Sequence, residues 1–203
     1  LWELDLPPSR LWAWALAPPL LLYVGHNWDL LAMVLALGAF LAAERKKLVD
    51  ACALAGLGAA AKLFPVLLLP LFALRRFFAG RLSEVAAMAV AAVIAWAAVN
   101  LPFVLAAPEN WWEFYQFSSE RTGTRAAIWD LAGHYGVFAT DIPQRNLLSL
   151  LLFVAGAGAI LWLGWSRYRD RLWLLATPVL LWFILSSKVY SPQFDLWVYP
   201  FVL

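Results

Sequence analysis

Two apolar segments, 85–107 and 147–165, constrain this chain most, because neither contains a charged residue. Each is close to the roughly 20 residues that a helix needs to cross the hydrocarbon core of a membrane. A soluble domain would have to bury both segments on every side. The two segments therefore predict transmembrane helices.

The composition extends this prediction to the whole chain. Hydrophobic residues make up 64% and charged residues 14% of the 203 positions, against roughly 45–50% and about 25% in ordinary soluble domains. We therefore predict an all-α fold, a polytopic bundle of transmembrane helices, with residues 1–203 in a single transmembrane domain. Because the chain starts without Met and ends inside an apolar segment, we expect it to be an internal fragment of a longer protein.

The segment 48–74 allows two interpretations, since Lys62 and Pro65 lie near its centre. A single helix would leave the lysine charge inside the membrane. Two short, re-entrant helices meeting at residues 62–65 would place Lys62 at the tip of a hairpin.

The distribution of basic residues favours the hairpin. It places ten Lys and Arg residues on one side of the membrane and five on the other: Arg10, Arg45, Lys46, Lys47, Arg75, Arg76, Arg81, Arg167, Arg169 and Arg171 against Lys62, Arg121, Arg125, Arg145 and Lys188. An excess of basic residues is typical of the cytoplasmic side. The side with five is therefore expected to be extracytoplasmic.

Four polar segments lie on this extracytoplasmic side: residues 26–29, Lys62, a loop at 108–146, and a polar segment at 186–197 between two apolar runs. Charged groups near membrane depth are costly, so they usually face a cavity or a partner. We therefore predict that Lys62, Asp29 and Lys188 line one cavity open to this face.

The same lysines and aspartate also have simpler interpretations. Lys62 and Lys188 are also typical of interfacial anchors, whose ammonium groups reach the headgroup region. Asp29 would favour the N-terminus of a helix even without a functional role.

The loop at 108–146 has two informative parts. Residues 109–117 mix aromatic and polar side chains, which is typical of a helix lying on the membrane surface or of an aromatic belt. Arg121 and Arg125 carry guanidinium groups suited to bidentate phosphate binding. The spacing equally allows salt bridges to Glu120 or Asp130.

A family resemblance is carried by Ser187-Lys188-Val189-Tyr190-Ser191-Pro192-Gln193-Phe194, followed by Trp197 and Pro200. This segment resembles one found in GT-C-type membrane glycosyltransferases, in particular glycosyltransferase family 87. Three further segments are similar in kind and order: residues 27–31 opening a helix, residues 62–65 before a Leu-rich run and an Arg pair, and a tryptophan-rich loop with Arg121 followed by Ile128-Trp129. Together they cover most of the chain.

The resemblance implies a multi-pass enzyme of the bacterial plasma membrane, of mannosyl- or arabinosyltransferase type. It would transfer a sugar from a polyprenyl-phosphate donor to a lipid-linked or glycan acceptor outside the cytoplasm. No metal, cofactor or nucleic acid is expected.

The resemblance also implies roles for individual residues. The donor phosphate would be bound by Lys62, Arg121, Arg125 and Lys188. The sugar or acceptor would meet His26, Asn27, Asp29, Trp129, Tyr190 and Gln193. The catalytic base, an aspartate, would lie in an extracytoplasmic loop before Leu1, with Asp29 as a second acid near the site.

Two other functions stay open from the residues alone. Proline-broken helices and half-helix hairpins are also typical of transporters, so a transporter or lipid flippase fits the pattern. A non-catalytic membrane subunit would be favoured if Lys62, Lys188 and Arg121 lay far apart.

Overall fold

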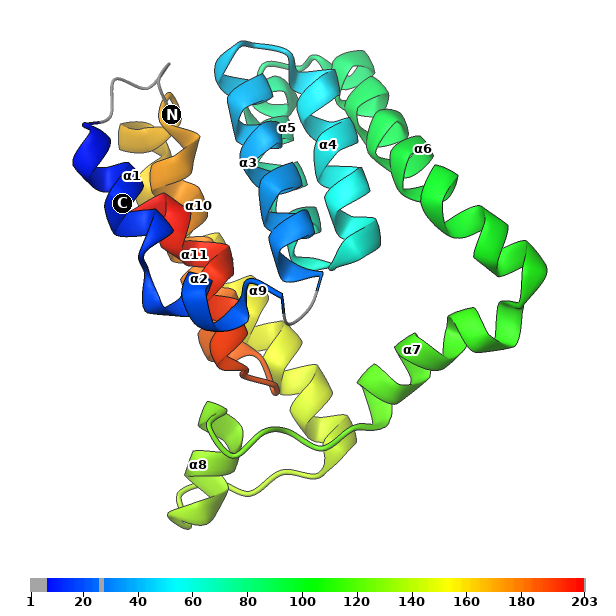
Figure 1. Ribbon diagram of the computed structural model, residues 1–203, viewed down its shortest axis with the longest axis vertical. Coiled ribbons are helices and arrows are strands. Elements are labelled where there is room, and N and C mark those ends of the chain that lie inside the picture. Colours follow the sequence, from blue (N-terminus) through cyan, green and yellow to red (C-terminus); the bar gives the residue numbers. More distant parts are fainter. Residues whose placement is uncertain (1–6, 26–27, 203) are drawn as a thin grey trace.

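The computed structural model describes residues 7–25 and 28–202, and over these residues every regular element is a helix (Figure 1). The elements are α1 (Pro8–Ala15), α2 (Pro18–Tyr23), α3 (Asp29–Glu44), α4 (Leu48–Ala61), η2 (Phe64–Leu67), α5 (Leu68–Phe78), α6 (Leu82–Ala106), α7 (Pro108–Glu120), α8 (Ile128–His134), α9 (Ile142–Tyr168), α10 (Leu172–Ser186), η3 (Pro192–Phe194) and α11 (Asp195–Val202). The predicted all-α class is confirmed for the described residues.

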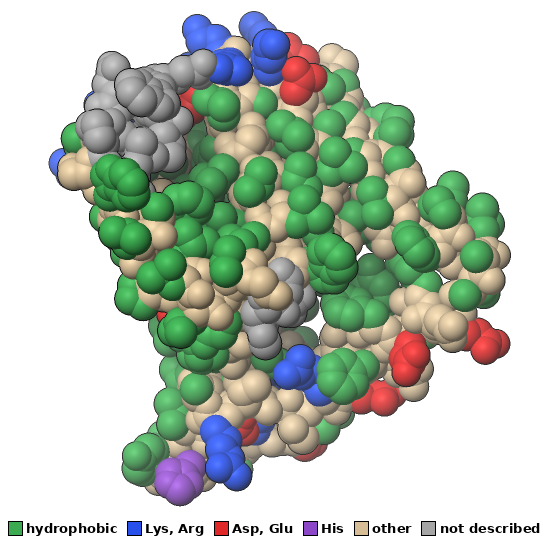
Figure 2. Space-filling model, viewed as in Figure 1, with side chains coloured by type: hydrophobic (Ala, Val, Ile, Leu, Met, Phe, Trp, Pro, Cys, Tyr) green, Lys and Arg blue, Asp and Glu red, His purple; other side chains and the backbone are tan. Residues whose placement is uncertain are grey.

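Two of these helices, α6 and α9, are long and apolar enough to cross a membrane. They contain 25 and 27 residues, and only 11% and 6% of their most apolar windows are buried in the protein. The core helix of a soluble protein would be mostly buried instead. Figure 2 shows apolar side chains spread over most of the visible face, as a membrane setting requires.

Helices α3, α4 and α6 pack through small residues. Ala32, Ala36, Ala51 and Ala55 are completely buried between them. A Cβ atom at Gly56 would clash with the carbonyl oxygen of Ala92 on α6. Small residues allow this close approach of two helix backbones, a common feature of membrane helices.

The predicted hairpin at residues 62–65 is confirmed. Helix α4 ends at Ala61, Lys62 is extended with φ −154° and ψ 141°, and Pro65 lies in η2. Helix α5 then runs back, so that Arg76 pairs with Glu84 at 3.2 Å and Arg75 with Asp170 at 2.7 Å. Basic side chains gather at this end of the molecule (Figure 2).

The helix over the second apolar segment is longer than the segment itself, because α9 begins at Ile142, five residues before Leu147. Asp141 caps the helix: its side chain accepts from the backbone N–H of Gln144 at 2.8 Å, and the Gln144 side chain accepts from the N–H of Asp141 at 3.3 Å. This reciprocal capping box satisfies two free donors. The segment 108–146 is consequently more helical than a loop, since it also contains α7 and α8.

Helices α9 and α10 pack through Gly156, as its small size predicts. A Cβ atom there would overlap the indole of Trp182, whose N–H donates to the carbonyl oxygen of Leu152 at 2.9 Å. Gly158 makes no similar contact, because a Cβ atom at this position would meet nothing within 4 Å. Gly158 lies on another face of α9, two residues or about 200° around the helix from Gly156.

Candidate functional site

A buried ion pair forms where α3 begins and α4 ends. The Nζ atom of Lys62 lies 3.5 Å from Oδ2 of Asp29, and the other oxygen, Oδ1, accepts a hydrogen bond from the indole N–H of Trp197 at 2.7 Å. The side chain of Asp29 is 2% exposed and that of Lys62 is 24% exposed. Asp29 therefore joins Lys62 to the C-terminal polar segment through Trp197.

Aromatic stacking fixes the position of Trp197. Its ring centroid lies 4.1 Å from that of Phe194 and 4.6 Å from that of Phe64, and both pairs are stacked. Phe64 belongs to the turn that follows Lys62. The turn at residues 62–65 therefore positions both contacts of Asp29: it carries Lys62, and its Phe64 ring stacks on Trp197.

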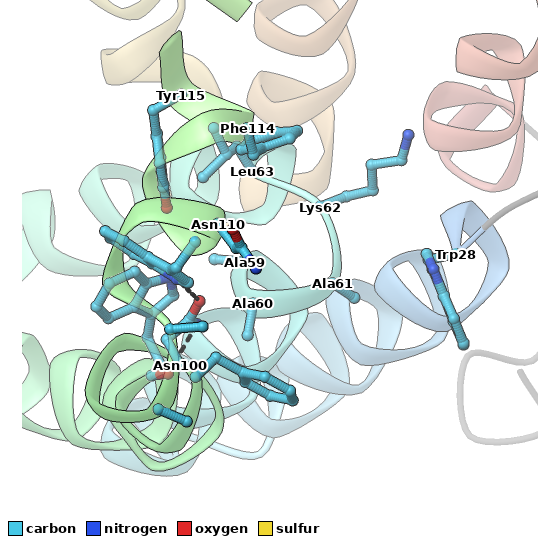
Figure 3. A pocket seen from close by; sticks show the side chains of 15 residues that line it. Trp28, Ala59, Ala60, Ala61, Lys62, Leu63, Asn100, Asn110, Phe114 and Tyr115 are labelled. Atoms are coloured by element: carbon cyan, nitrogen blue, oxygen red, sulfur yellow. Dashed lines mark hydrogen bonds between the residues drawn. The ribbon is translucent and has the colours of Figure 1, made fainter. Parts of the chain in front are cut away.

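A cleft of about 670 Å³ opens between the end of α4 and the bend where α6 meets α7. Aromatic side chains line it together with the amides of Asn100 and Asn110, the phenol of Tyr115, and Lys62 at its rim. Figure 3 shows Lys62 turned away from Phe114, Tyr115 and Asn100. Asn100 is held in place, because it accepts from the indole of Trp111 at 2.9 Å and donates to the carbonyl of Trp96 at 3.0 Å.

Lys188 belongs to a second cluster, near the end of α7. Its ammonium group donates to the carbonyl oxygen of Ser119 at 3.0 Å, in the last turn of that helix. A cation is favourable at this negative end of the helix dipole. Arg121 and Arg145 lie close enough to repel it, and burial together with these two arginines lowers the pKa of Lys188.

The loop that carries Arg121 docks onto the polar segment 186–197 through its backbone. The hydroxyl of Thr124 donates to the carbonyl of Tyr190 and accepts from its N–H, both at 2.8 Å. The indole of Trp129 donates to the carbonyl of Ser186 at 2.9 Å. A Cβ atom at Gly123 would lie 2.6 Å from Nη1 of Arg145 and 2.7 Å from the carbonyl oxygen of Lys188, so only glycine fits here.

Beside this cluster runs a groove of about 220 Å³ between α9 and α10. One part of its lining is polar, with Asn146, Ser149, Ser186, Ser187 and Lys188. The other part is apolar and consists of Leu150, Phe153 and Phe183. The groove thus has one end with a lysine and serine hydroxyls. Its other end is apolar and includes residues of α9, a helix long enough to span a membrane.

Comparison with protein families identifies the chain. The sequence model of glycosyltransferase family 87 matches residues 2–192, nearly the whole length. The chain belongs to glycosyltransferase family 87. Comparisons with curated proteins and with solved structures gave no significant match.

Family membership makes the chain a glycosyltransferase, and the resemblance noted from the sequence is confirmed. Of the residues expected in its site, His26 and Asn27 lie outside the described part of the chain. Asp29 and Lys62 come together. The predicted common cavity is wrong, because only Lys62 lines the α4–α6–α7 cleft, whereas Asp29 is buried beneath it and Lys188 donates to the Ser119 carbonyl at the end of α7.

The other expected residues cluster around the polar segment 186–197. Tyr190 donates its hydroxyl to Asp195 at 3.3 Å, and burial followed by the charge of Asp195 raises its pKa. Gln193 is 8% exposed. Arg121 lies over the ring of Phe117, with 5.3 Å from its guanidinium carbon to the ring centroid, and Arg125 is exposed.

Two residues of these clusters were not expected as site residues. Arg145 pairs with Asp130 at 2.8 Å and lies close enough to Lys188 to lower its pKa, which the sequence could not indicate because these residues are far apart along the chain. Trp197 was noted only as part of the family resemblance. No local signal indicated its role as an indole donor, because its acceptor Asp29 lies 168 residues away along the chain.

Proposed function

We propose that this family 87 glycosyltransferase takes a sugar from a polyprenyl-phosphate donor and transfers it to a lipid-linked or glycan acceptor on the extracytoplasmic face of the membrane. The observation that carries the proposal is the cluster of Arg121, Arg145 and Lys188. Of these three cations, only Arg145 forms an ion pair with a described carboxylate, that of Asp130 at 2.8 Å, so the charges of Arg121 and Lys188 are not balanced by a paired carboxylate among the described residues.

A phosphate leaving group fits this charge balance. When the bond between sugar and phosphate breaks, negative charge develops on the departing oxygen, and preorganised cations stabilise it. Arginine presents paired N–H donors that match phosphate oxygens. Arg121 forms no ion pair with the described residues, and its N–H groups are therefore available to a ligand.

A lipid carrier fits the neighbouring groove. With the phosphate at Lys188 and Arg121, an isoprenoid chain would run along Leu150, Phe153 and Phe183 toward the membrane-exposed surface of α9. Arg125, exposed on the same loop, would meet the phosphate from the solvent side. Trp129, Tyr190 and Gln193 would border the sugar.

The side of the membrane follows from the distribution of basic residues. The end of α4 and the segment after α7 lie away from the turns between α3 and α4 and between α5 and α6, which carry the basic residues at 45–47 and 75–81 (Figure 1). An excess of Lys and Arg is typical of the cytoplasmic side. We assign the segment 108–146 and both polar sites to the extracytoplasmic face, within one multi-pass membrane domain that includes residues 1–203.

The role assigned to Asp29 is to hold Lys62. Its carboxylate is buried and already contacts Lys62 and Trp197, so it has no free path to an acceptor hydroxyl. We therefore propose that a carboxylate other than Asp29 accepts the proton of the acceptor hydroxyl.

The test measures transfer of labelled sugar by the purified full-length protein, with polyprenyl-phosphate mannose and polyprenyl-phosphate arabinose as alternative donors. Washed membranes from cells lacking the gene supply the acceptor. A charge-assisted hydrogen bond contributes about 1.5–3 kcal/mol, and each 1.4 kcal/mol is about tenfold in affinity. Arg121→Ala should therefore raise the KM for the donor at least about tenfold.

Lys47→Ala is the matched control, because this exposed lysine lies at the basic end of the molecule. It should leave the donor KM unchanged. An Arg121→Ala enzyme with a normal donor KM would refute the phosphate site, and a wild-type protein that uses neither donor would refute the proposed donor class.

A further inference from the structure

We infer that the cleft between α4, α6 and α7 binds the neutral sugar units of a carbohydrate acceptor, apart from the hydroxyl that reacts. The inference rests on the proposed function, in which the donor occupies the cluster around Lys188. No residue of that cluster lines this cleft. A second substrate can therefore occupy the cleft while the donor is bound.

The size of the cleft suits a ligand of more than one ring. Its volume of about 670 Å³ falls well within the roughly 300–1,000 Å³ of small-molecule sites. The donor groove beside Lys188 is smaller, at about 220 Å³. The larger space is consistent with an extended glycan.

Charge excludes an anionic ligand as the preferred occupant. Lys62 is the only charged residue that lines the cleft in the described part of the chain, and Asp29 balances it at 3.5 Å. The ion pair is therefore neutral overall. The cluster around Lys188, in contrast, carries excess positive charge and is the better site for phosphate.

The chemistry of the lining matches a sugar better than an isoprenoid chain. Sugar rings have C–H faces that pack on aromatic rings, and Phe103, Trp111 and Phe114 supply such rings. Sugar hydroxyls need hydrogen-bonding partners. Asn110 and Tyr115 line the cleft, and neither side chain forms a hydrogen bond to the described residues, so both are available. An isoprenoid chain would leave these polar groups unpaired, which costs free energy.

The location also fits an acceptor attached to the membrane. The cleft lies where α6, a candidate membrane-spanning helix, ends and α7 begins. Helix α7 contains Trp111, Trp112 and Tyr115, residue types that are enriched at the boundary between membrane and water. The head of a lipid-linked glycan would lie at this level.

The first measurement is the apparent KM for the acceptor, obtained by varying the amount of washed acceptor membranes at saturating donor. We expect Asn110→Ala and Phe114→Ala each to raise it about fivefold or more, because each removes one hydrogen bond or one stacking ring. The KM for the donor should not change. Glu113→Ala is the control, since this exposed residue lies on the same helix but does not line the cleft.

The second measurement does not depend on the donor. Neutral oligosaccharides released from the same membranes are passed over immobilised full-length protein in detergent. The wild-type protein and the Glu113→Ala variant should retard them, whereas Asn110→Ala should not. Tyr115→Phe, which keeps the ring and removes only the hydroxyl, should give intermediate retention.

Equal retention by wild type and Asn110→Ala, or no retention by either, would overturn the inference. So would an unchanged acceptor KM in Asn110→Ala and Phe114→Ala, even if the wild type transfers sugar normally. If instead the wild type fails to use polyprenyl-phosphate sugars, the proposed donor is wrong, and the retention measurement still decides the role of the cleft.

Discussion

Replacing Lys62 tests the buried ion pair between the end of α4 and the start of α3. In Lys62→Met the apolar stem is kept but the ammonium group is lost, so the carboxylate of Asp29 remains buried at 2% exposure without a counter-charge. Removing one partner of a buried pair typically costs about 3–5 kcal/mol. Because Lys62 is 24% exposed, we expect the lower end, a loss of about 3 kcal/mol in the free energy of unfolding.

Replacing Asp29 should cost less. In Asp29→Asn the amide oxygen can still accept from the indole of Trp197, and the ammonium group of Lys62 can turn toward solvent. We expect a loss of about 1 kcal/mol, the value of an ordinary hydrogen bond. Asp29→Ala should be worse, because the buried indole N–H would then lack its acceptor.

The double variant Lys62→Met/Asp29→Asn decides whether the two residues interact. It removes both charges together, so no carboxylate is left unpaired, and its loss should be smaller than the sum of the single losses by about 2 kcal/mol. The measurement is denaturant unfolding of the purified full-length protein in mild detergent. Additive losses, within about 0.5 kcal/mol, would refute the ion pair as a source of stability.

Three further changes test the charges and the packing around the second cluster and the packing of α9 on α10. Gly123→Ala should lower donor affinity strongly with little change in unfolding temperature, because the added Cβ atom would press on Arg145 and on the carbonyl of Lys188 only in the short loop between α7 and α8; donor binding and thermal unfolding check this. Burial, Arg121 and Arg145 lower the pKa of Lys188, so its ammonium group loses its proton at a lower pH than in an ordinary lysine. Donor binding should therefore weaken as the pH rises through that pKa. Arg121→Gln should therefore move the alkaline limb of the pH–rate profile to higher pH, although burial, the larger cause, remains, whereas Lys47→Gln should not move it. Gly156→Ala should lower the free energy of unfolding by about 1–3 kcal/mol, because the methyl group displaces the indole of Trp182 from between α9 and α10, while Gly158→Ala should have little effect.

The helices were largely predictable because apolar runs and prolines act locally. The break at Pro18-Pro19 separates α1 from α2, and α10 ends at Ser186, where the polar segment begins. The hairpin at Lys62 followed from counting basic residues on each side, a rule that depends on the membrane and not on side-chain packing. The early start of α9 was missed although its signal is local, since Asp141 and Gln144 form a capping box three residues apart.

The partners of the charged residues were less predictable because they depend on how distant helices pack. Lys62 and Lys188 lie on the same predicted side, and nothing in their neighbours in sequence indicates that one would meet Asp29 and the other the end of α7. That choice follows from the direction of α7 after Ala107, where the backbone leaves the axis of α6 (Figure 1). The pairing of Arg145 with Asp130 is likewise set by the position of α8.

The polar segment 186–197 connects the two sites physically. At its start, Lys188 contacts the end of α7, and at its end Trp197 contacts Asp29. Between them, η3 contains Pro192, which limits backbone freedom, and Phe194, which stacks on Trp197. A shift of this segment would therefore change the donor cluster and the Asp29–Lys62 pair together. In the proposed reaction this coupling has a use, because Lys62 also lies at the rim of the cleft assigned to the acceptor. A short segment restricted by Pro192 therefore helps to hold the donor phosphate and the acceptor in a fixed relation, as transfer of the sugar requires.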